Sequence, residues 1–302
     1  MNQCMKRFFH SYRILVKGYL YLFALRHKMQ INFDSKKILI TKNEDFITLD
    51  IEHLPYSRDV IENFEYYYFA TSSLLKDYSI TKDQNIAGFE SFPLLTPSIP
   101  EPLETVIQYL EILNLVKGDT VLDLGAYSGL SSIKFQECVG RFGKVVAVEA
   151  DPENARCCEV NFSRFFSEFG YSPLLVKKAI WGEVTQISFS AENSLGSAVS
   201  SLLPRAKVGG QLVQTTTLSA VASELNLKKI DAIKADIEGA EYFAFLDEEF
   251  FKKFHPKIVF EPAEETSIFT KGKSIISLLS KYGYSCHIRE QRGSQLPLIV
   301  CV

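Results

Sequence analysis

The feature that most constrains the fold is a regular alternation of short apolar strands with longer helices, which begins after Gly118. Strands that alternate with helices of about ten residues form a parallel sheet with helices on both faces. A last pair of strands, 284–289 and 297–302, is too closely spaced for a helical crossover, so we expect an antiparallel hairpin at the sheet edge. The other expected strands are 120–124, 145–149, 174–177, 231–236 and 258–261, and the expected helices are 130–139, 152–166, 218–225, 240–251 and 274–282.

The first hundred residues predict a smaller α+β extension. Residues 31–51 alternate weakly between apolar and polar side chains, as in a hairpin, and residues 57–76 have helical spacing. Four prolines between residues 91 and 102 indicate a stiff linker, and a helix is expected at 104–115. We therefore divide the chain into a basic, aromatic segment (1–30), an N-terminal α+β region (31–100) and a larger α/β domain (101–302).

Charge is distributed unevenly along the chain. Residues 1–30 contain six bases and no acid, and the rest of the chain has a surplus of nine acids. Because nucleic acid requires a basic surface, we expect no nucleic-acid partner for the acidic body. Bases interleaved with aromatic rings suit a helix that lies on an anionic membrane surface. A helix packed on the protein itself, or on a second subunit of a homo-oligomer, is the alternative.

The location is expected to be cytoplasmic, with membrane contact at the inner face if the first of these alternatives holds. No apolar run reaches the roughly 20 residues that span a bilayer. The apolar stretch 14–25 contains Lys17 and lacks a small-residue cleavage pattern, so we do not interpret it as a signal peptide. The six cysteines include no Cys-x-x-Cys pair and have no histidine at ligand spacing, which indicates a reducing setting without a zinc site.

The first motif is Val-Leu-Asp-Leu-Gly-Ala-Tyr-Ser-Gly at residues 121–129, where an apolar strand leads into a glycine turn and a helix. Gly125 and Gly129 permit positive φ and close approach of a ligand to the backbone. The spacing lacks the middle glycine of dinucleotide-binding loops. The carboxylate of Asp123 would repel a pyrophosphate but would suit an ammonium group or a ribose hydroxyl. S-adenosylmethionine is therefore favoured over NAD, and a purely structural turn is the alternative.

The second motif follows the next strand. Glu149 ends this strand twenty residues after Gly129, where nucleotide-binding α/β folds place an acid that accepts the ribose hydroxyls. Asp151 precedes Pro152, so it is either a helix N-cap or a ligand contact. The loop after the third strand, with Ala179 and Ile180, is expected to lie over the adenine ring.

The third motif covers residues 230–241. Lys234, Asp236 and Glu238 are expected to alternate on one face at the carboxyl end of a central strand, and Glu261 ends the neighbouring strand. Such clustered ionisable groups favour a functional site with perturbed pKa values. The alternative is a solvated strand end at which Asp236 or Glu238 caps the next helix. Carboxylates can also bind Mg²⁺, but Lys234 among them counts against this, so no metal is expected.

These three motifs, in this order within residues 101–302, resemble those of the FkbM family of S-adenosylmethionine-dependent methyltransferases. The specific one is Lys-Ala-Asp-Ile-Glu-Gly-Ala-Glu at 234–241, and Tyr127-Ser128 departs from the family pattern. The resemblance implies a class I methyltransferase Rossmann-like sheet, mostly parallel with an antiparallel C-terminal hairpin. It also implies S-adenosylmethionine as cofactor and O-methylation of a sugar, glycolipid or macrolide hydroxyl. The expected cofactor contacts are Asp123, Gly125, Ala126, Tyr127, Gly129, Glu149, Ala150, Asp151, Ala179, Ile180 and Asp236.

The expected reaction is an in-line transfer of the methyl group to a small-molecule or glycan hydroxyl. Asp236 is the first candidate for general base or hydroxyl-orienting group. Lys234 would stabilise a developing alkoxide or hold Asp236 in place. Glu238 and Glu261 are candidates for binding the acceptor. An NAD-dependent oxidoreductase and a non-catalytic binding protein on the same fold are the alternative functions.

Acceptor specificity is expected in an insertion at residues 183–217, with strands at 186–190 and 212–217 around a polar loop at 193–201. A surface loop without function is the alternative. The loop contains no aromatic side chain on which a sugar could stack. Tyr66, Tyr67 or Tyr68 would have to provide that platform.

Overall fold

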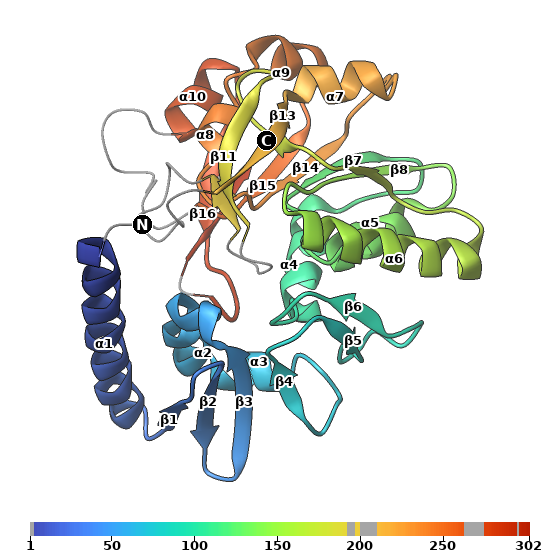
Figure 1. Cartoon of the computed structure of the whole chain (residues 1–302). Helices are drawn as coiled ribbons and strands as arrows, with labels where there is room; N and C mark the ends of the chain where they lie inside the picture. Colours follow the sequence, from blue (N-terminus) through green and yellow to red (C-terminus); the bar gives the residue numbers. More distant parts are fainter. Residues whose placement is uncertain (1–2, 192–196, 200–209, 263–274, 295) are drawn as a thin grey trace.

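The larger domain contains a seven-stranded sheet in the order β16-β17-β15-β14-β7-β8-β9 (Figure 1). The computed structural model describes residues 3–191, 197–199, 210–262, 275–294 and 296–302. All neighbouring strands are parallel except that β17 runs antiparallel to both β15 and β16, which confirms the expected edge hairpin. The strands are β7 (Thr120–Leu124), β8 (Lys144–Val148), β9 (Leu174–Val176), β14 (Ala232–Ala235), β15 (Lys257–Phe260), β16 (Cys286–Arg289) and β17 (Leu298–Cys301).

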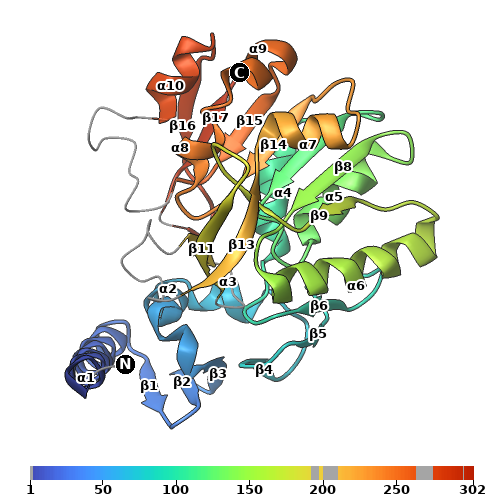
Figure 2. The same ribbon diagram turned by 45° about the horizontal axis from the view of Figure 1, so that its top comes forward.

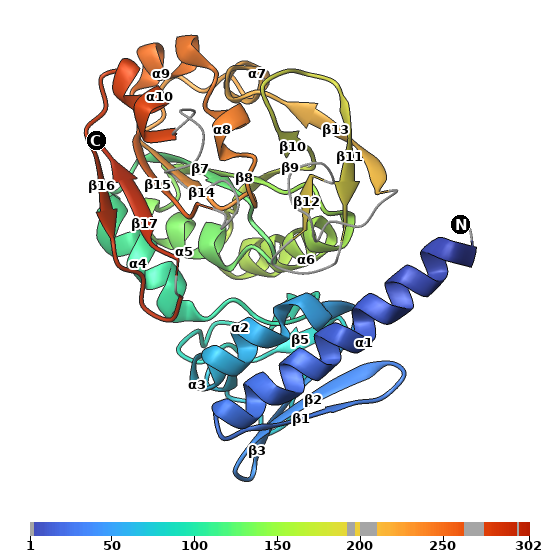
Figure 3. The same ribbon diagram turned by 90° about the vertical axis from the view of Figure 1, so that its left-hand side faces the viewer.

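Helices cover both faces of this sheet, as the alternation predicts, and each face has its own apolar core (Figure 3). The central strands are buried on both sides, which explains their continuous apolar runs. The result is an α/β fold with the mostly parallel central sheet that the sequence predicts. One face carries α4 (Leu103–Leu113), α5 (Leu130–Val139) and α6 (Pro152–Phe169), and the other carries α7 (Leu218–Glu224), α8 (Glu241–Ala244), α9 (Glu248–Phe254) and α10 (Ile275–Lys281).

The insertion after β9 forms a second, smaller sheet in the order β10-β13-β11-β12. Figure 2 shows its strands β11 and β13 side by side. Its strands β11 and β13 pair antiparallel in the expected hairpin. Most of the predicted loop 193–201 lies outside the described residues. The strands are β10 (Ala179–Ile180), β11 (Gln186–Ser190), β12 (Ala198–Val199) and β13 (Gln211–Thr216).

The N-terminal region packs around a third apolar core, which includes Leu20 and Ala24 of the first helix. The expected hairpin is part of a four-stranded sheet, β1-β2-β3-β4. The single helix expected at 57–76 is wrong. Asn63 interrupts it, so that two short helices form, and the second of these ends at Tyr68. The chain then reaches β4 through a non-helical segment that contains Thr-Ser-Ser. The elements are α1 (Gln3–Arg26), β1 (Gln30–Phe33), β2 (Lys37–Lys42), β3 (Asp45–Asp50), η1 (Ile51–Tyr56), α2 (Ser57–Glu62), α3 (Phe64–Tyr68) and β4 (Lys76–Tyr78).

The proline-rich linker at 91–102 is more structured than the composition predicts. It contains β6 (Leu94–Thr96), which pairs with β5 (Lys82–Gln84). The side chain of Asn161 on α6 accepts a hydrogen bond from Leu95 N at 2.8 Å and donates one to Leu95 O at 2.9 Å. The segment is thus fastened to the larger domain just before residue 101.

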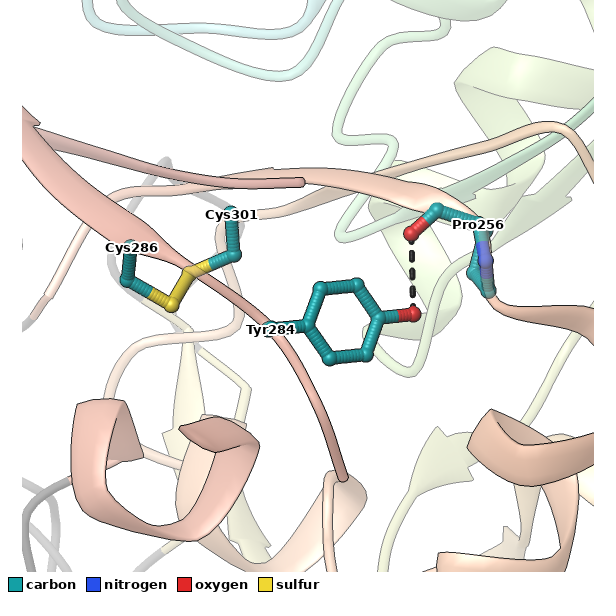
Figure 4. The surroundings of a disulfide bond; sticks show 4 residues. All are labelled: Pro256, Tyr284, Cys286 and Cys301. Atoms are coloured by element: carbon teal, nitrogen blue, oxygen red, sulfur yellow. Dashed lines mark hydrogen bonds between the residues drawn. A yellow bond between two sulfur atoms is a disulfide. The ribbon is translucent and has the colours of Figure 1, made fainter. Parts of the chain in front are cut away.

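Two further expectations are wrong. The helix expected at 240–251 is two short helices, because Asp247 interrupts it and accepts a hydrogen bond from Phe250 N as the N-cap of α9. The reducing setting expected from the cysteine pattern does not predict a disulfide, but Cys286 and Cys301 form one (Figure 4). The two cysteines are fifteen residues apart and face each other only through the register of β16 and β17. Spacing therefore could not reveal the pair.

Candidate functional site

A cavity of about 670 Å³, including open solvent at its mouth, lies at the carboxyl ends of β7, β8 and β14. Open α/β sheets bind their ligands at this edge, and the volume is in the range of small-molecule sites. Asp123, Ala126, Gly129 and Asp151 are buried and do not line it. The predicted residues that do line it are Gly125, Tyr127, Glu149, Ala150, Ala179, Ile180, Lys234 and Asp236.

Residues 125–129 of the first motif form a loop between β7 and α5, which we call the first loop. Packing within the protein requires glycine at two of its positions. Gly125 has φ +78°, and a β-carbon built on it would lie 1.9 Å from the carbonyl oxygen of Asp236. Gly129 has φ +86°, and a β-carbon there would lie 2.6 Å from the ring of Phe162. Each position therefore needs both the conformational freedom and the small size of glycine.

Asp123 and Lys234 hold the first loop against β14. Asp123 Oδ2 accepts hydrogen bonds from Ser131 Oγ at 2.7 Å and Ser132 Oγ at 2.5 Å, and its Oδ1 lies 3.4 Å from Lys234 Nζ. Lys234 Nζ also donates to Gly125 O at 2.7 Å. Burial lowers the pKa of Lys234, but the carboxylates around it, Asp123 foremost, raise it above its ordinary value overall. The ammonium group is therefore charged at neutral pH and tied to the loop.

Tyr127 connects Glu149, at the end of β8, to the segment before α4. Its backbone N–H donates to Glu149 Oε2 at 2.8 Å, and its hydroxyl donates to Ile99 O at 2.7 Å and lies 3.2 Å from Ser98 Oγ. Its φ of +53° is in the left-handed region. The bulky residue at the position that departs from the family pattern thus fastens the segment before α4 to the first loop.

Glu149 is fixed at the end of β8, as the second motif predicts. Its Oε1 accepts a hydrogen bond from Asp151 N at 2.8 Å, and its Oε2 accepts the one from Tyr127. Burial raises the pKa of Glu149 to about 7, against the lowering effect of these N–H donors. Each oxygen retains acceptor capacity for a ligand hydroxyl on the cavity side.

Asp151 takes the N-cap alternative. Its Oδ1 accepts hydrogen bonds from Glu153 N and Asn154 N at the start of α6, and Ser197 Oγ donates to its Oδ2 at 2.7 Å. The last contact joins the insertion to the second motif. Phe189 and Val199 of the insertion line the same cavity as Ala179 and Ile180, so the insertion adds apolar side chains to the cavity lining.

Asp236 follows the end of β14 and lines the cavity. Burial raises the pKa of its carboxyl group, and Lys234 opposes this shift. The expected alternation stops at Asp236, because Glu238 has φ +52° and does not line the cavity. Neither acid caps the next helix, since the cap of α8 is Ala240 without a side-chain hydrogen bond.

Two more glutamates surround this turn. Glu241 Oε1 accepts a hydrogen bond from Ile237 N at 3.0 Å, so the last residue of the third motif stabilises the turn itself. Glu261 does not line the cavity, but it lies close enough to Asp236 and Glu238 for their charges to act on it. Burial raises the pKa of Glu261 well above its ordinary value, and Asp236 adds to the shift.

Glu101 is a cavity residue that sequence reasoning missed. It ends the proline-rich segment, is only 8 % exposed, and lines the cavity with Lys234 and Asp236. Burial raises the pKa of Glu101 to about 8; Lys234 opposes the shift, whereas Asp123 and Asp236 add to it. The sequence around Glu101 does not indicate that it lines a cavity, because Glu101 lies outside all three motifs and far from them along the chain.

The candidate stacking tyrosines do not line the cavity. Tyr67 donates to Asp59 and Tyr68 to Asp45, both within the N-terminal region. Tyr66 hydrogen-bonds to Thr105, and its ring occupies the space beside Gly293. Tyr66 therefore packs between α4 and the loop before β17. Within the described part of the chain, no group of three or more His, Cys, Asp or Glu residues could hold a metal ion.

Comparison with known proteins agrees with this site. The model of the methyltransferase FkbM domain matches residues 123–286, more than half of the chain. The model of protein-L-isoaspartate(D-aspartate) O-methyltransferase matches residues 59–168. A search among curated proteins found no match.

Three solved structures are similar in backbone. The methyltransferase FkbM from Methylobacillus flagellatus KT is 13% identical with a TM-score of 0.46, and the match covers 83% of this chain and 55% of that chain. This chain thus spans little more than half the length of that protein. Fibrillarin from Aeropyrum pernix, in complex with S-adenosyl-L-methionine, is 10% identical with a TM-score of 0.42, and 90% and 98% are covered. The O-methyltransferase from Bacillus cereus is 15% identical with a TM-score of 0.41, and 67% and 81% are covered.

The family match contains all of the residues that line the cavity except Glu101. It begins at Asp123 and includes the first loop, Glu149 and the whole motif at 234–241. The chain therefore belongs to the methyltransferase FkbM domain family of S-adenosylmethionine-dependent methyltransferases.

Proposed function

We propose that this protein transfers the methyl group of S-adenosylmethionine to a hydroxyl oxygen of a sugar, a glycolipid or a glycosylated natural product. The observation that carries the proposal is the placement of Asp236. Asp236 lines the cavity at the end of the central strand, together with Gly125 of the first loop. A hydroxyl is a poor nucleophile until its proton has a destination, and a positioned carboxylate supplies one.

The residues of the cavity fit the cofactor. Glu149 offers two fixed carboxylate oxygens, which would accept hydrogen bonds from both ribose hydroxyls. Ala179 and Ile180 provide apolar contact for the adenine ring. When bound, the cofactor supplies an electrophilic methyl group on a positively charged sulfur.

Asp236 would orient the acceptor hydroxyl and accept its proton as the oxygen–carbon bond forms. The acceptor oxygen would displace the sulfur, which would keep the electron pair of the carbon–sulfur bond. Lys234 contributes by position, because its ammonium group keeps the first loop and β14 in contact. Alignment of this kind can contribute on the order of 7 to 11 kcal/mol to catalysis. Glu261 and Glu238, beside Asp236, would bind further hydroxyls of the acceptor.

The proposal is tested by incubating the protein with methyl-labelled S-adenosylmethionine and fractionated glycans and glycolipids, followed by mass analysis of labelled products. Label in a methyl ether of a sugar supports the proposal. Label on a nitrogen, a sulfur or a carboxylate oxygen would show that the acceptor is not a hydroxyl and would contradict the proposal. Binding of S-adenosylhomocysteine without transfer to any fraction would favour a non-catalytic binding protein.

We also propose that α1 attaches the enzyme to an anionic membrane surface. Leu20 and Ala24 are buried in the N-terminal core, whereas Leu15 and Leu22, on the other face of the helix, are 73% and 67% exposed. The exposed face also carries Tyr19 and Leu25. Figure 3 shows that α1 extends beyond the region on which it packs.

Charge favours a membrane over a second copy of the chain as the occupant of this face. Residues 1–30 carry six bases and no acid, so two copies of α1 would repel each other, whereas anionic lipid would attract each of them. Among the described helices, none is long and apolar enough to cross a membrane. The proposed contact is therefore with the surface of the bilayer.

A further inference from the structure

Glu101 is a buried carboxyl group without a protein partner. It makes no hydrogen bond or ion pair with any residue that the structure describes, although only 8 % of it is exposed. An unpartnered buried carboxylate costs several kcal/mol of desolvation, so such groups are retained where a ligand supplies the missing partner. Glu101 lines the cavity together with Gly125, Tyr127 and Asp236, so we look for the missing partner in the cavity.

The neighbouring charges of the first loop are already used within the protein. Asp123, the acid that the first motif suggested for an ammonium group, accepts hydrogen bonds from two serines and pairs with Lys234. Lys234 donates to Gly125 O. The charge of Lys234 lowers the pKa of Glu101, but neither Lys234 nor Asp123 forms a hydrogen bond or an ion pair with it among the described residues. The cofactor end of the cavity therefore carries two carboxyl groups, Glu101 and Asp236, whose pKa values are raised by burial and whose ionised forms a cationic group of a ligand would stabilise.

The attachment of Glu101 links it to the cofactor loop. The segment that carries it is held by Tyr127, whose hydroxyl donates to Ile99 O at 2.7 Å. The backbone of the same tyrosine donates to Glu149. One residue of the first loop therefore positions both acids, Glu149 for the ribose side and Glu101 on the other side of the loop. The acceptor candidates Glu238 and Glu261 do not line this wall.

We infer that Glu101 binds the α-ammonium group of the methionine part of the cofactor, in the role that the sequence suggested for Asp123. This inference rests on the proposed function, because it requires S-adenosylmethionine in the cavity. An ammonium donor next to a buried carboxylate forms a charge-assisted hydrogen bond. The segment before α4 then has a function in the methyltransferase site, since it supplies a cofactor-binding residue from outside the family match, which begins at residue 123.

The test compares two ligands that differ at the proposed contact. S-adenosylhomocysteine carries the α-ammonium group, and 5′-methylthioadenosine lacks the whole amino-acid part. Calorimetric titration of Glu101→Gln should show at least a tenfold loss of affinity for S-adenosylhomocysteine and less than a twofold change for 5′-methylthioadenosine. The matched variant Glu149→Gln should weaken both ligands, because it changes the ribose contact that they share.

The outcomes separate this inference from the proposed function. Unchanged affinity of Glu101→Gln for S-adenosylhomocysteine overturns the inference and leaves the proposed function intact. Loss of turnover in Glu101→Gln with unchanged affinity also overturns it and moves Glu101 to the acceptor. A wild-type protein that binds neither ligand contradicts the proposed function itself.

The melting temperatures of the wild type and Glu101→Gln distinguish a ligand-binding role of Glu101 from a purely structural one. A ligand-binding carboxylate without a protein partner opposes folding, so Glu101→Gln without ligand should melt at or above the wild-type temperature. Its gain in melting temperature with S-adenosylhomocysteine should be smaller than that of the wild type. A lower melting temperature without ligand, with an equal loss of affinity for both ligands, would assign Glu101 a structural role and overturn the inference.

Discussion

Gly125 and Asp236 are in backbone contact across two neighbouring strands, and a β-carbon on Gly125 would lie 1.9 Å from the carbonyl oxygen of Asp236. This contact sets the distance between the first loop and the end of β14. Lys234 reinforces it by donating to Gly125 O. The first loop and Asp236, the proposed base, are therefore held in place by direct contact between their backbones.

Gly125→Ala should lower the free energy of unfolding by about 2–5 kcal/mol, from the positive φ and the overlap with Asp236 together. Gly170→Ala is the matched control, because Gly170 has the same φ of +78° and nothing within 4 Å of its β-carbon position. The control should lose only about 1–2 kcal/mol. Urea unfolding measures both, and equal losses would show that the contact with Asp236 is unimportant.

Asp236→Asn should reduce kcat by about 10²- to 10⁴-fold, because the amide cannot accept the hydroxyl proton. The fold and the affinity for S-adenosylhomocysteine should change little, since the two side chains have the same shape. Glu238→Gln should instead raise KM for the acceptor. Turnover by Asp236→Asn at the wild-type rate would remove Asp236 from the mechanism.

The effect of Glu101 on stability should depend on pH. Its folded pKa of about 8 lies above the ordinary value of 4.5, so the protonated form is favoured by folding, and stability is lost as pH rises through this range. Each pH unit costs the wild type at most about 1.4 kcal/mol relative to Glu101→Gln. The charged groups that face Glu101, Lys234, Asp123 and Asp236, are the same in both proteins. Urea unfolding at several values between pH 5 and pH 8 should show a growing difference, and a constant difference would argue against the raised pKa.

Reduction of the disulfide Cys286–Cys301 should destabilise the edge of the sheet. The bond closes a loop of fifteen residues, for which chain entropy predicts a loss of about 3 kcal/mol. Denaturant unfolding with and without a thiol reductant measures this loss. The double variant Cys286→Ser/Cys301→Ser should be insensitive to the reductant, and an equally insensitive wild type would mean that the bond does not form.

The exposed face of α1 is tested by paired leucine variants. Leu15→Ala/Leu22→Ala should reduce binding to phosphatidylglycerol vesicles at least tenfold, with little change in stability. Leu20→Ala, on the buried face, should cost about 2–5 kcal/mol of stability. Co-sedimentation with these vesicles and with neutral vesicles measures binding. A dimer of the wild type that the double variant loses in sedimentation would identify a second copy as the partner instead.

The sequence predicts the larger domain well because each strand is followed by a helix and the strands are buried on both faces. Thr120–Leu124 and Ala232–Ala235 appear within or at the expected bounds for this reason. Local chemistry overrides the pattern elsewhere: Asp247 caps a new helix inside an apolar run, and Asn63 interrupts another. Each of these interruptions depends on a single residue, and the spacing of apolar residues over a longer window does not reveal it.

The site could be predicted only where its residues follow a strand. Glu149 and Asp236 do, and both line the cavity. Asp123 lies one residue before the end of β7, but its carboxylate accepts hydrogen bonds from Ser131 and Ser132 of the following helix, and it does not line the cavity. Glu101 reaches the cavity through tertiary contacts of Tyr127, which have no counterpart in local spacing.

The central claim is methyl transfer to a hydroxyl at Asp236, and the most direct measurement is transfer of labelled methyl from S-adenosylmethionine to fractionated glycans by the wild type and by Asp236→Asn. The account predicts a labelled sugar methyl ether with the wild type and at most about one hundredth of its rate with the variant. Equal labelling by both proteins, or label at an atom other than a hydroxyl oxygen, would contradict it.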